Sequence, residues 1–385
     1  MTTRTSRISA SSAARWRRAP GRRRGPTSPA ARAAAVAALG ATVLAGCGGH
    51  HKLTLQKPPP PSSTSATTAA TTTTTTRPKP KPKPVQPLTG LPATSAAQAS
   101  NPAVIVKIDN IDAARPQTGP NQADIVYEEL VEGGLTRLAA VFQSGYPTVV
   151  GPVRSGRLTD IGIADDYNHP VFAYSGTNGV YLPILRSQPF TDVDGDNHPG
   201  AFYRVNFAAA PHNLYSNVVT LAGISSTHTA PLPIFLYHAP GAPLTGRGVS
   251  PAQHLGINFP NAAVAWDYNA ATKLWQRTQN GTPDVDRSGQ QMTANNLVVQ
   301  FVPYVTAGLA TGEGGPPAPI PQGMLTGSGK AWFLSGGRIV GGTWARANLT
   351  TRTIFRDQAG ALIHLAPGRT WVELVPVGIA PQLVP

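Results

Sequence analysis

Residues 102–160 place the strongest constraint on the fold of this chain, because charged residues alternate there with short apolar runs. The stretch holds four arginines and seven of the eighteen acidic residues, although only 13% of the chain is charged. A fold that buries the apolar runs must pair many of these charges, so we expect a site or an internal network of ion pairs here. The residues are Arg115, Arg137, Arg154 and Arg157 with Asp109, Asp112, Asp124, Glu128, Glu129, Glu132 and Asp160.

Two consecutive glutamates in this stretch cannot both face solvent. Residues 125–131 are predicted to form a strand, and its two-residue period sets Glu129 beside Tyr127 and Glu128 beside Val126. One glutamate must therefore share a face with apolar residues. A buried carboxylate needs a partner, and the arginines nearby are expected to supply it.

The four arginines have two explanations, and the sequence leaves both open. In the first, they line a pocket that binds a phosphate, a carboxylate or a uronate, because guanidinium groups offer planar, paired donors to such anions. In the second, they form an internal network of salt bridges that joins the strands.

Four motifs in this stretch identify a family. They are IDN at residues 108–110, ARPQ at 114–117, ADIVYEELVEGGLTR at 123–137 and GPVRSGR at 151–157. In these motifs the chain resembles the YerB-like lipoproteins, a bacterial family of unknown function. Further matches extend the resemblance over residues 87–385, with PHNLY at 211–215, LWQR at 274–277, GSGKA at 327–331 and PGRTWVELVP at 367–376.

The resemblance implies a fold and a location but no activity. The implied fold class is α+β, arranged as a layered sheet–sheet–helix sandwich with a C-terminal part that is mostly antiparallel β. The implied location is the extracytoplasmic face of the cell membrane, where a lipid anchor would hold the protein.

Net charge argues against nucleic acid as a partner. The chain carries a formal charge of +14, but residues 1–84 hold 15 of the 32 lysines and arginines and none of the 18 acidic residues. The remainder therefore has 17 basic residues against 18 acidic ones. A near-neutral folded part does not provide the basic surface that phosphate backbones require.

The N-terminal residues 1–47 have the pattern of a lipoprotein signal peptide. An arginine-rich region precedes the apolar residues 33–44, which are too few to cross a bilayer at ~20 residues per span. Leu44-Ala45-Gly46-Cys47 resembles the bacterial lipobox, so we expect lipidation of Cys47, the only cysteine. A plain signal peptide with a chance cysteine is the alternative. Residues 48–87, rich in proline, threonine and lysine, are expected to form a disordered tether.

Two folded regions are predicted after the tether. In residues 88–245 we expect strands at 104–108, 125–131, 138–142 and 171–174, a short helix or turn at 160–167 and a helix at 214–221. In residues 255–385 we expect a hairpin of 262–268 with 272–278, a strand at 297–302 and a mostly antiparallel sheet or small barrel. The Gly/Pro-rich residues between 302 and 330 are predicted to be a loop.

Three residues outside the charged stretch are further candidates. His212 is suited to proton transfer near neutral pH, although a histidine before a helix is often a structural cap. Arg204 and Asn213 lie close to it in sequence. The acidic run at residues 192–198 lacks the spacing of an EF-hand and is better explained as an exposed turn, so no metal site is predicted. No nucleotide or dinucleotide motif is present, and no cofactor is expected.

These observations favour a binding or scaffold protein of the cell envelope. Its ligand would be an anionic wall polymer or an envelope protein, bound by Arg115, Arg137, Arg154, Arg157, Arg204 and Asn213. The alternative is a hydrolase or transferase acting on wall glycan. Such an enzyme would use a carboxylate pair from Asp109, Asp124, Glu128 and Glu132, assisted by His212.

Overall fold

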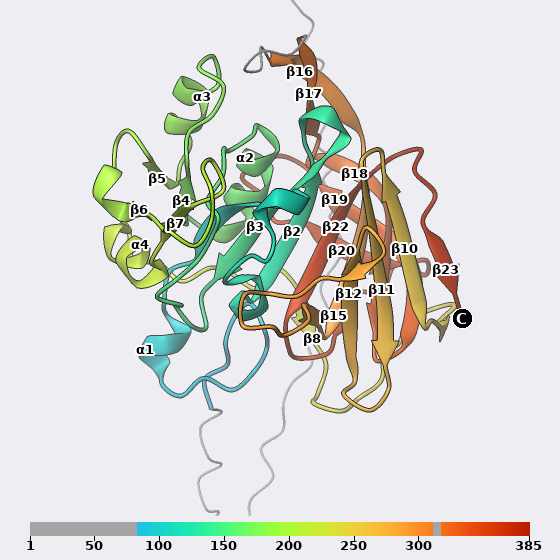
Figure 1. Cartoon of the computed structure of the whole chain (residues 1–385). Coiled ribbons are helices and arrows are strands. Elements are labelled where there is room, and N and C mark those ends of the chain that lie inside the picture. Colours follow the sequence, from blue (N-terminus) through green and yellow to red (C-terminus); the bar gives the residue numbers. More distant parts are fainter. Residues whose placement is uncertain (1–82, 311–316) are drawn as a thin grey trace, which may run out of the picture. The chain divides into compact units, whose positions relative to one another are not determined.

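A single large sheet runs through both predicted regions (Figure 1). The structure, a computed structural model, describes residues 83–310 and 317–385. The predicted signal peptide, Cys47 and most of the predicted tether lie outside these residues. In the described part, no helix is both long and apolar enough to cross a membrane.

The central sheet is mixed, with eleven strands. In spatial order they are β20 (Ile354–Asp357), β19 (Arg338–Arg346), β18 (Gly327–Ser335), β15 (Asn296–Val302), β22 (Thr370–Pro376), β2 (Ile125–Leu130), β3 (Thr136–Phe142), β1 (Val104–Asp109), β4 (Val171–Tyr174) and β5 (Thr191–Asp194), with β9 (Ser250–Pro251) beside β19. The late strand β22 lies between β15 and β2 and is parallel to both. All six residues of β1 and six of the seven in β22 are buried, as expected for strands covered on both faces.

A second, antiparallel sheet packs against one face of the central sheet (Figure 1). Its strands are β13 (Thr282–Pro283), β12 (Leu274–Gln279), β11 (Ala262–Asn269), β10 (His254–Phe259) and β23 (Gln382–Val384), with β14 (Thr293–Ala294) beside β12. Leu255, Val264 and Trp266 of this sheet share a core with Val126 and Val299 of the central sheet. Residues at alternate positions of the central strands, such as Ile105 and Val298, form a separate core on the other face.

Short helices cover parts of the central sheet that the second sheet does not contact. Helix α4 (Val218–Ile224) contributes Val218 and Leu221 to the inter-sheet core, and α2 (Thr159–Ala164) contributes Ile163 to the opposite one. The other elements are α1 (Ala96–Ala99), α3 (Leu182–Arg186), the 3-10 turns η1 (Asp112–Ala114), η2 (Pro120–Gln122), η3 (Glu132–Gly134), η4 (Asp165–Tyr167) and η5 (Pro199–Ala201), and the paired strands β6 (Phe202–Arg204) with β7 (Leu214–Ser216), β8 (Leu236–Tyr237) with β21 (His364–Leu365), and β16 (Tyr304–Ala310) with β17 (Ala318–Gly323).

The fold is mostly β with a few short helices, so the predicted α+β class gave helices too much weight. The predicted strands of the first region and the predicted hairpin are present as β1, β2, β3, β4, β11 and β12. The helix predicted at 214–221 is instead strand β7 followed by α4. Asn217 separates them, because its side chain accepts the amide hydrogens of Val219 and Thr220 and so caps the helix.

The loop predicted between residues 302 and 330 was wrong in part. Residues 304–310 and 318–323 pair as the ribbon β16–β17, and β18 begins at Gly327. Prolines misled the prediction, since Pro319 and Pro321 stand within β17 opposite Leu309 and Thr306. A two-stranded ribbon accepts proline because each of its strands has an outer edge without ladder hydrogen bonds.

Arg277 occupies the centre of the interface between the two sheets. Its side chain is completely buried and binds Glu128, with a separation of 2.6 Å between NH2 and Oε2, and Asp284. The guanidinium carbon lies 5.0 Å from the ring centre of Trp371 and 6.0 Å from that of Trp266. Burial alone would lower the pKa of Arg277, but the carboxylates around it raise that pKa above its usual value.

We expect Arg277→Met to destabilise the fold by about 3–5 kcal/mol, because it leaves buried carboxylates without a counter-charge. The free energy of unfolding in guanidinium chloride measures this. Lys273→Met, on the exposed turn between β11 and β12, is the matched control. The double variant Arg277→Met/Glu128→Gln should recover part of the loss, and a single variant as stable as the control would contradict the expectation.

Candidate functional site

Asp109, the last residue of β1, lies at the centre of a cluster of charged side chains. Its carboxylate is buried, and Oδ2 lies 2.8 Å from Nδ1 of His212 and 3.0 Å from Nε of Arg154. The three residues are far apart in sequence. The chain brings them together because the amide of Asp109 donates to Pro152 and the amide of Arg154 donates to Lys107, which fixes the segment before Arg154 beside β1.

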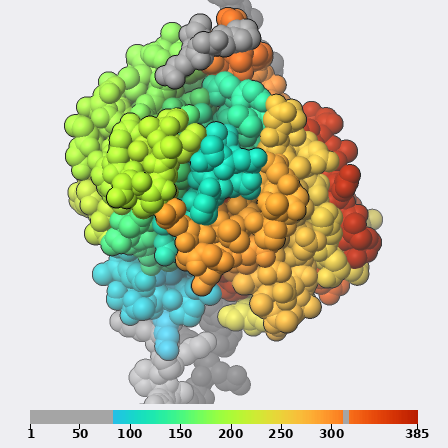
Figure 2. All heavy atoms as spheres, viewed as in Figure 1, coloured from blue at the N-terminus to red at the C-terminus, as the bar shows by residue number. Residues whose placement is uncertain are grey.

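His212 is held against Asp109 by the pairing of β7. The amide of Val153 donates to the carbonyl of Leu214 at 2.6 Å, so the turn before β7 reaches the end of β1. In Figure 2 the yellow-green surface of the β6–β7 hairpin meets the teal surface of the segment after β1. The bond from Nδ1 to Asp109 orients the ring, and within the described residues Nε2 has no hydrogen-bond partner. His212 is therefore an oriented imidazole, its side chain 14% exposed.

Arg137 is the least compensated charge in the cluster. It stands opposite Asp109 in the register of β1 with β3, and its NH1 donates to the carbonyl of Ser155 at 3.0 Å. In the described part of the chain, no carboxylate lies within 4.0 Å of its guanidinium. Burial first, and then the neighbouring charge of Arg157, lowers the pKa of Arg137 to about 10, so it remains a cation at neutral pH.

Arg157 completes the group and has its own partner. Its Nε and NH2 both donate to Oε2 of Glu132, at 2.9 and 2.7 Å. Although burial acts to raise the pKa of Glu132, the hydrogen bonds and charge of Arg157 hold it below its usual value. We call Arg137, Arg154 and Arg157 the arginine cluster. Glu132 and Asp109 flank it.

A closed network of charges supports the arginine cluster from within the sheet. Lys107, fully buried on β1, binds Asp160 at 2.8 Å and also Glu129. The other oxygen of Asp160 accepts the amide hydrogen of Arg157 at 2.7 Å. Burial first, and then the charge of Asp160, raises the pKa of Glu129 to about 7. The network fixes the loop that carries Arg157 and is closed to solvent.

Two predicted carboxylates lie away from the arginine cluster. Glu128 faces the second sheet, where Asn110, Thr136 and Arg277 surround it. Asp124 binds the backbone amides that follow β3, and burial raises its pKa. Both are fully enclosed by hydrogen-bond donors.

Three predicted binding residues also lie elsewhere. Arg115 binds Asp112 and lies 3.6 Å from Asp284, at the edge of the inter-sheet network. Arg204 donates to Asn213 at 2.6 Å on the exposed β6–β7 hairpin. Asn213 follows His212 directly in sequence. The structure thus places Asp109, Glu132, His212 and the arginine cluster together and the other candidates apart.

Sequence reasoning missed Lys107 and Arg277, which decide where the two glutamates face. A signal for each was present. Lys107 interrupts the apolar run VIVKI, and a strand with apolar residues on both faces has no solvent side for a lysine. Arg277 stands two residues after Trp275 in a strand of period two, and so shares the face of that buried tryptophan.

The arrangement can bind an anion and orient a proton acceptor beside it. Arg137 and Arg154 are half-buried, so their donors are only partly satisfied by water. Guanidinium groups in such surroundings bind carboxylate or phosphate strongly, because little water must be displaced.

The comparisons with known proteins agree with the motifs. The N-terminal domain model of the protein of unknown function DUF3048 matches residues 88–230, and its C-terminal domain model matches residues 255–372. The putative lipoprotein YerB of Bacillus subtilis (strain 168) is 26% identical over 299 residues, which cover 75% of this chain and 86% of the relative.

The crystal structure of the YerB protein from Bacillus subtilis has the same fold, with a TM-score of 0.65 at 24% identity. The match covers 77% of this chain and 99% of that one. The resemblance to YerB-like proteins is therefore confirmed: the chain belongs to the DUF3048 family of unknown function, with both its N- and C-terminal domains, and is distantly related to YerB.

Proposed function

We propose that this protein is a lipid-anchored binding protein of the cell envelope whose arginine cluster recognises an anionic group. The observation that carries the proposal is Arg137, a half-buried cation beside two other arginines with no carboxylate within 4.0 Å in the described residues. Its hydrogen bond to the carbonyl of Ser155 does not neutralise its charge. An anionic ligand would supply the missing counter-charge.

The neighbours of Arg137 favour an anion from outside the chain as its partner, rather than a carboxylate of the chain itself. Asp109 is engaged by Arg154 and His212, and Glu132 by Arg157. Each carboxylate near the cluster is thus already shared, so the cluster has more positive than negative charge to offer. A wall polymer with phosphate or carboxylate groups, or an acidic surface of an envelope protein, has the matching chemistry.

The location is proposed from the N-terminal sequence and a relative. Leu44-Ala45-Gly46-Cys47 provides the lipidation signal, and the relative from Bacillus subtilis is named a putative lipoprotein. A lipid on Cys47 would hold the folded part at the extracytoplasmic face of the cell membrane. Envelope polymers would then be within reach of the arginine cluster.

A second candidate function is hydrolysis or transfer on wall glycan. The contact between Asp109 and His212 favours it, because a carboxylate on Nδ1 leaves Nε2 as the basic nitrogen of the ring. Of the four carboxylates considered from sequence, only Asp109 and Glu132 lie beside the arginine cluster. His212 would then act as the base while the arginines hold the charged substrate.

Binding to insoluble wall fragments tests the proposed function. We expect the full chain carrying Cys47→Ser to sediment with them, and Arg137→Met/Arg154→Met to weaken binding by about tenfold or more, as lost charged hydrogen bonds would. Arg356→Met, an exposed arginine on β20, is the matched control. Unchanged binding in a folded double variant would refute the assignment, and prior extraction of the anionic polymers should abolish wild-type binding.

Release of soluble glycan from the same fragments tests the catalytic alternative. If His212 is the base, His212→Gln should still bind the wall fragments. It should release soluble glycan from them at least ~100-fold more slowly, the usual contribution of a general base. No release by the unsubstituted chain would eliminate the enzyme and leave the binding protein.

Membrane attachment has a separate test. We expect Cys47→Ala to move the protein from the membrane fraction to the soluble fraction of fractionated cells, because the lipid would have no attachment point. Immunoblotting of both fractions measures this, with Ser95→Ala, in the folded part, as the control. Membrane retention equal to that of the control would contradict the anchor.

A further inference from the structure

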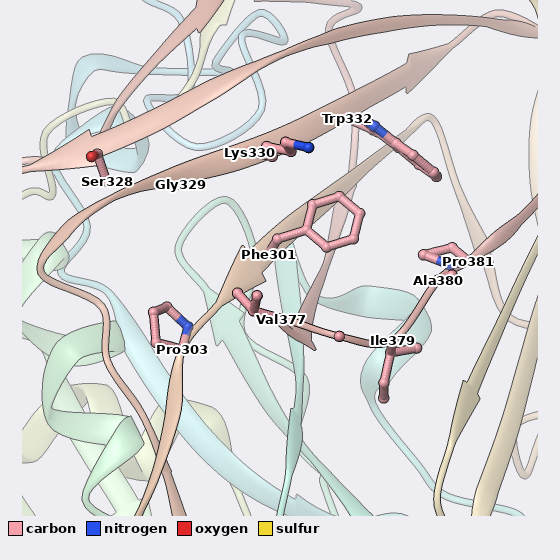
Figure 3. A pocket seen from close by; sticks show the side chains of 11 residues that line it. Phe301, Pro303, Ser328, Gly329, Lys330, Trp332, Val377, Ile379, Ala380 and Pro381 are labelled. Atoms are coloured by element: carbon pink, nitrogen blue, oxygen red, sulfur yellow. The ribbon is translucent and has the colours of Figure 1, made fainter.

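A cavity on the inter-sheet side of the central sheet is separate from the arginine cluster. Its volume is about 540 Å³, within the range of small-molecule sites. Phe301 of β15 and Trp332 of β18 form its floor, and the connection from β22 to β23 forms its wall (Figure 3). The full lining is Phe301, Pro303, Ser328, Gly329, Lys330, Trp332, Val377, Gly378, Ile379, Ala380 and Pro381.

One glycine bends the wall of the cavity, and another lies in the strand that carries its floor. Gly378 has φ +113°, a conformation that favours glycine, and it bends the connection around the cavity. At Gly329 a Cβ would come 2.6 Å from Nε1 of Trp344 and 2.7 Å from the carbonyl of Phe301, which bond each other at 2.9 Å. Glycine is therefore favoured at position 378 in the wall, and it is required at position 329 by the packing of β18 against Trp344 on the opposite face of the sheet.

Lys330 supplies the only charge in this lining. The alternation along β18 places it on the same face as Trp332 and the buried Leu334. Among the described residues it forms no ion pair with a carboxylate. Figure 3 shows Lys330 and Trp332 along one side of the cavity and Ile379 on the other, with Phe301 between them. The ammonium group of Lys330 is thus the one charged group in the lining of a mostly apolar cavity.

We propose that this cavity binds an amphiphilic anion, an alkyl or acyl chain that ends in a carboxylate or phosphate. The chain lies against Phe301, Trp332 and Ile379, and the head group binds Lys330. The rings of Phe301 and Trp332 pack edge to face, with their centres 5.3 Å apart. A sugar fits less well, since most of the lining is apolar and each buried hydroxyl without a partner is costly. The head group chemistry is shared by fatty acids and lipid phosphates.

Titration calorimetry with octanoate and 1-octanol tests the proposal on the full chain carrying Cys47→Ser. We expect Lys330→Met to raise the dissociation constant for octanoate about tenfold and to leave that for 1-octanol unchanged, because only the anion needs the charge. Ala380→Trp, which fills the cavity from its rim, should abolish binding of both. Lys273→Met should change neither, and octyl phosphate in place of octanoate separates the two head groups.

Three outcomes would overturn the proposal. They are the absence of saturable octanoate binding to the unsubstituted chain, an equal effect of Lys330→Met on both probes, and full binding in Ala380→Trp. Lys330 and Ala380 are exposed, so both variants should fold, which an unchanged urea midpoint verifies. Octanoate binding retained in Arg137→Met/Arg154→Met would establish that the two sites are independent.

Discussion

The parallel pairing of β2 with β22 is the constraint on which the rest of the structure depends. Its register sets Glu128 directly beside Glu373, with both side chains facing the second sheet. Burial first, and then the charge of Glu128, raises the pKa of Glu373 well above its usual value, which favours its neutral form. Trp266 donates to Glu373 at 2.8 Å, and Arg277 neutralises Glu128. The second sheet is therefore held in place by charge as well as by apolar contacts.

The two faces of the central sheet use buried charge differently. Between the sheets, Arg277 is paired with Glu128 and Asp284 and lies over the ring of Trp371. On the opposite face, the ion pairs of Lys107 are buried. The arginine cluster beside them is partly exposed and holds more cations than anions. The first arrangement serves stability. The second is the arrangement on which the proposed binding function rests, at the end of β1, where loops from several parts of the chain meet.

Local patterns predicted the strands, and motif resemblance predicted the family. Short apolar runs rich in β-branched residues located β1 and β2, and strand-like runs around a short turn located the β11–β12 hairpin, because these are local signals. The parallel contact of β2 with β22 was not predictable, since it joins residues about 245 positions apart. Without that contact, the partner of Glu128 could not be assigned to Arg277.

The same limit applies to the candidate site. Charge density pointed to residues 102–160, and the structure does bring Asp109, His212 and Arg154 together. Arg115, like Arg154, lies within two residues of a proline, yet it faces the inter-sheet network instead. The two arginines differ in the path that the chain takes between strands. Backbone pairings set this path, and they cannot be predicted from composition.

The position of β22 also affects how the protein must be made. Its residues are the last of the described central sheet to be synthesised, yet they fill a place between two strands that precede them in the chain. Until Thr370–Pro376 arrives, β2 and β15 present open edges with unpaired amides and carbonyls. A growing chain therefore exposes two unpaired strand edges until this last strand is made, and rapid completion or a chaperone keeps these edges from pairing with another chain.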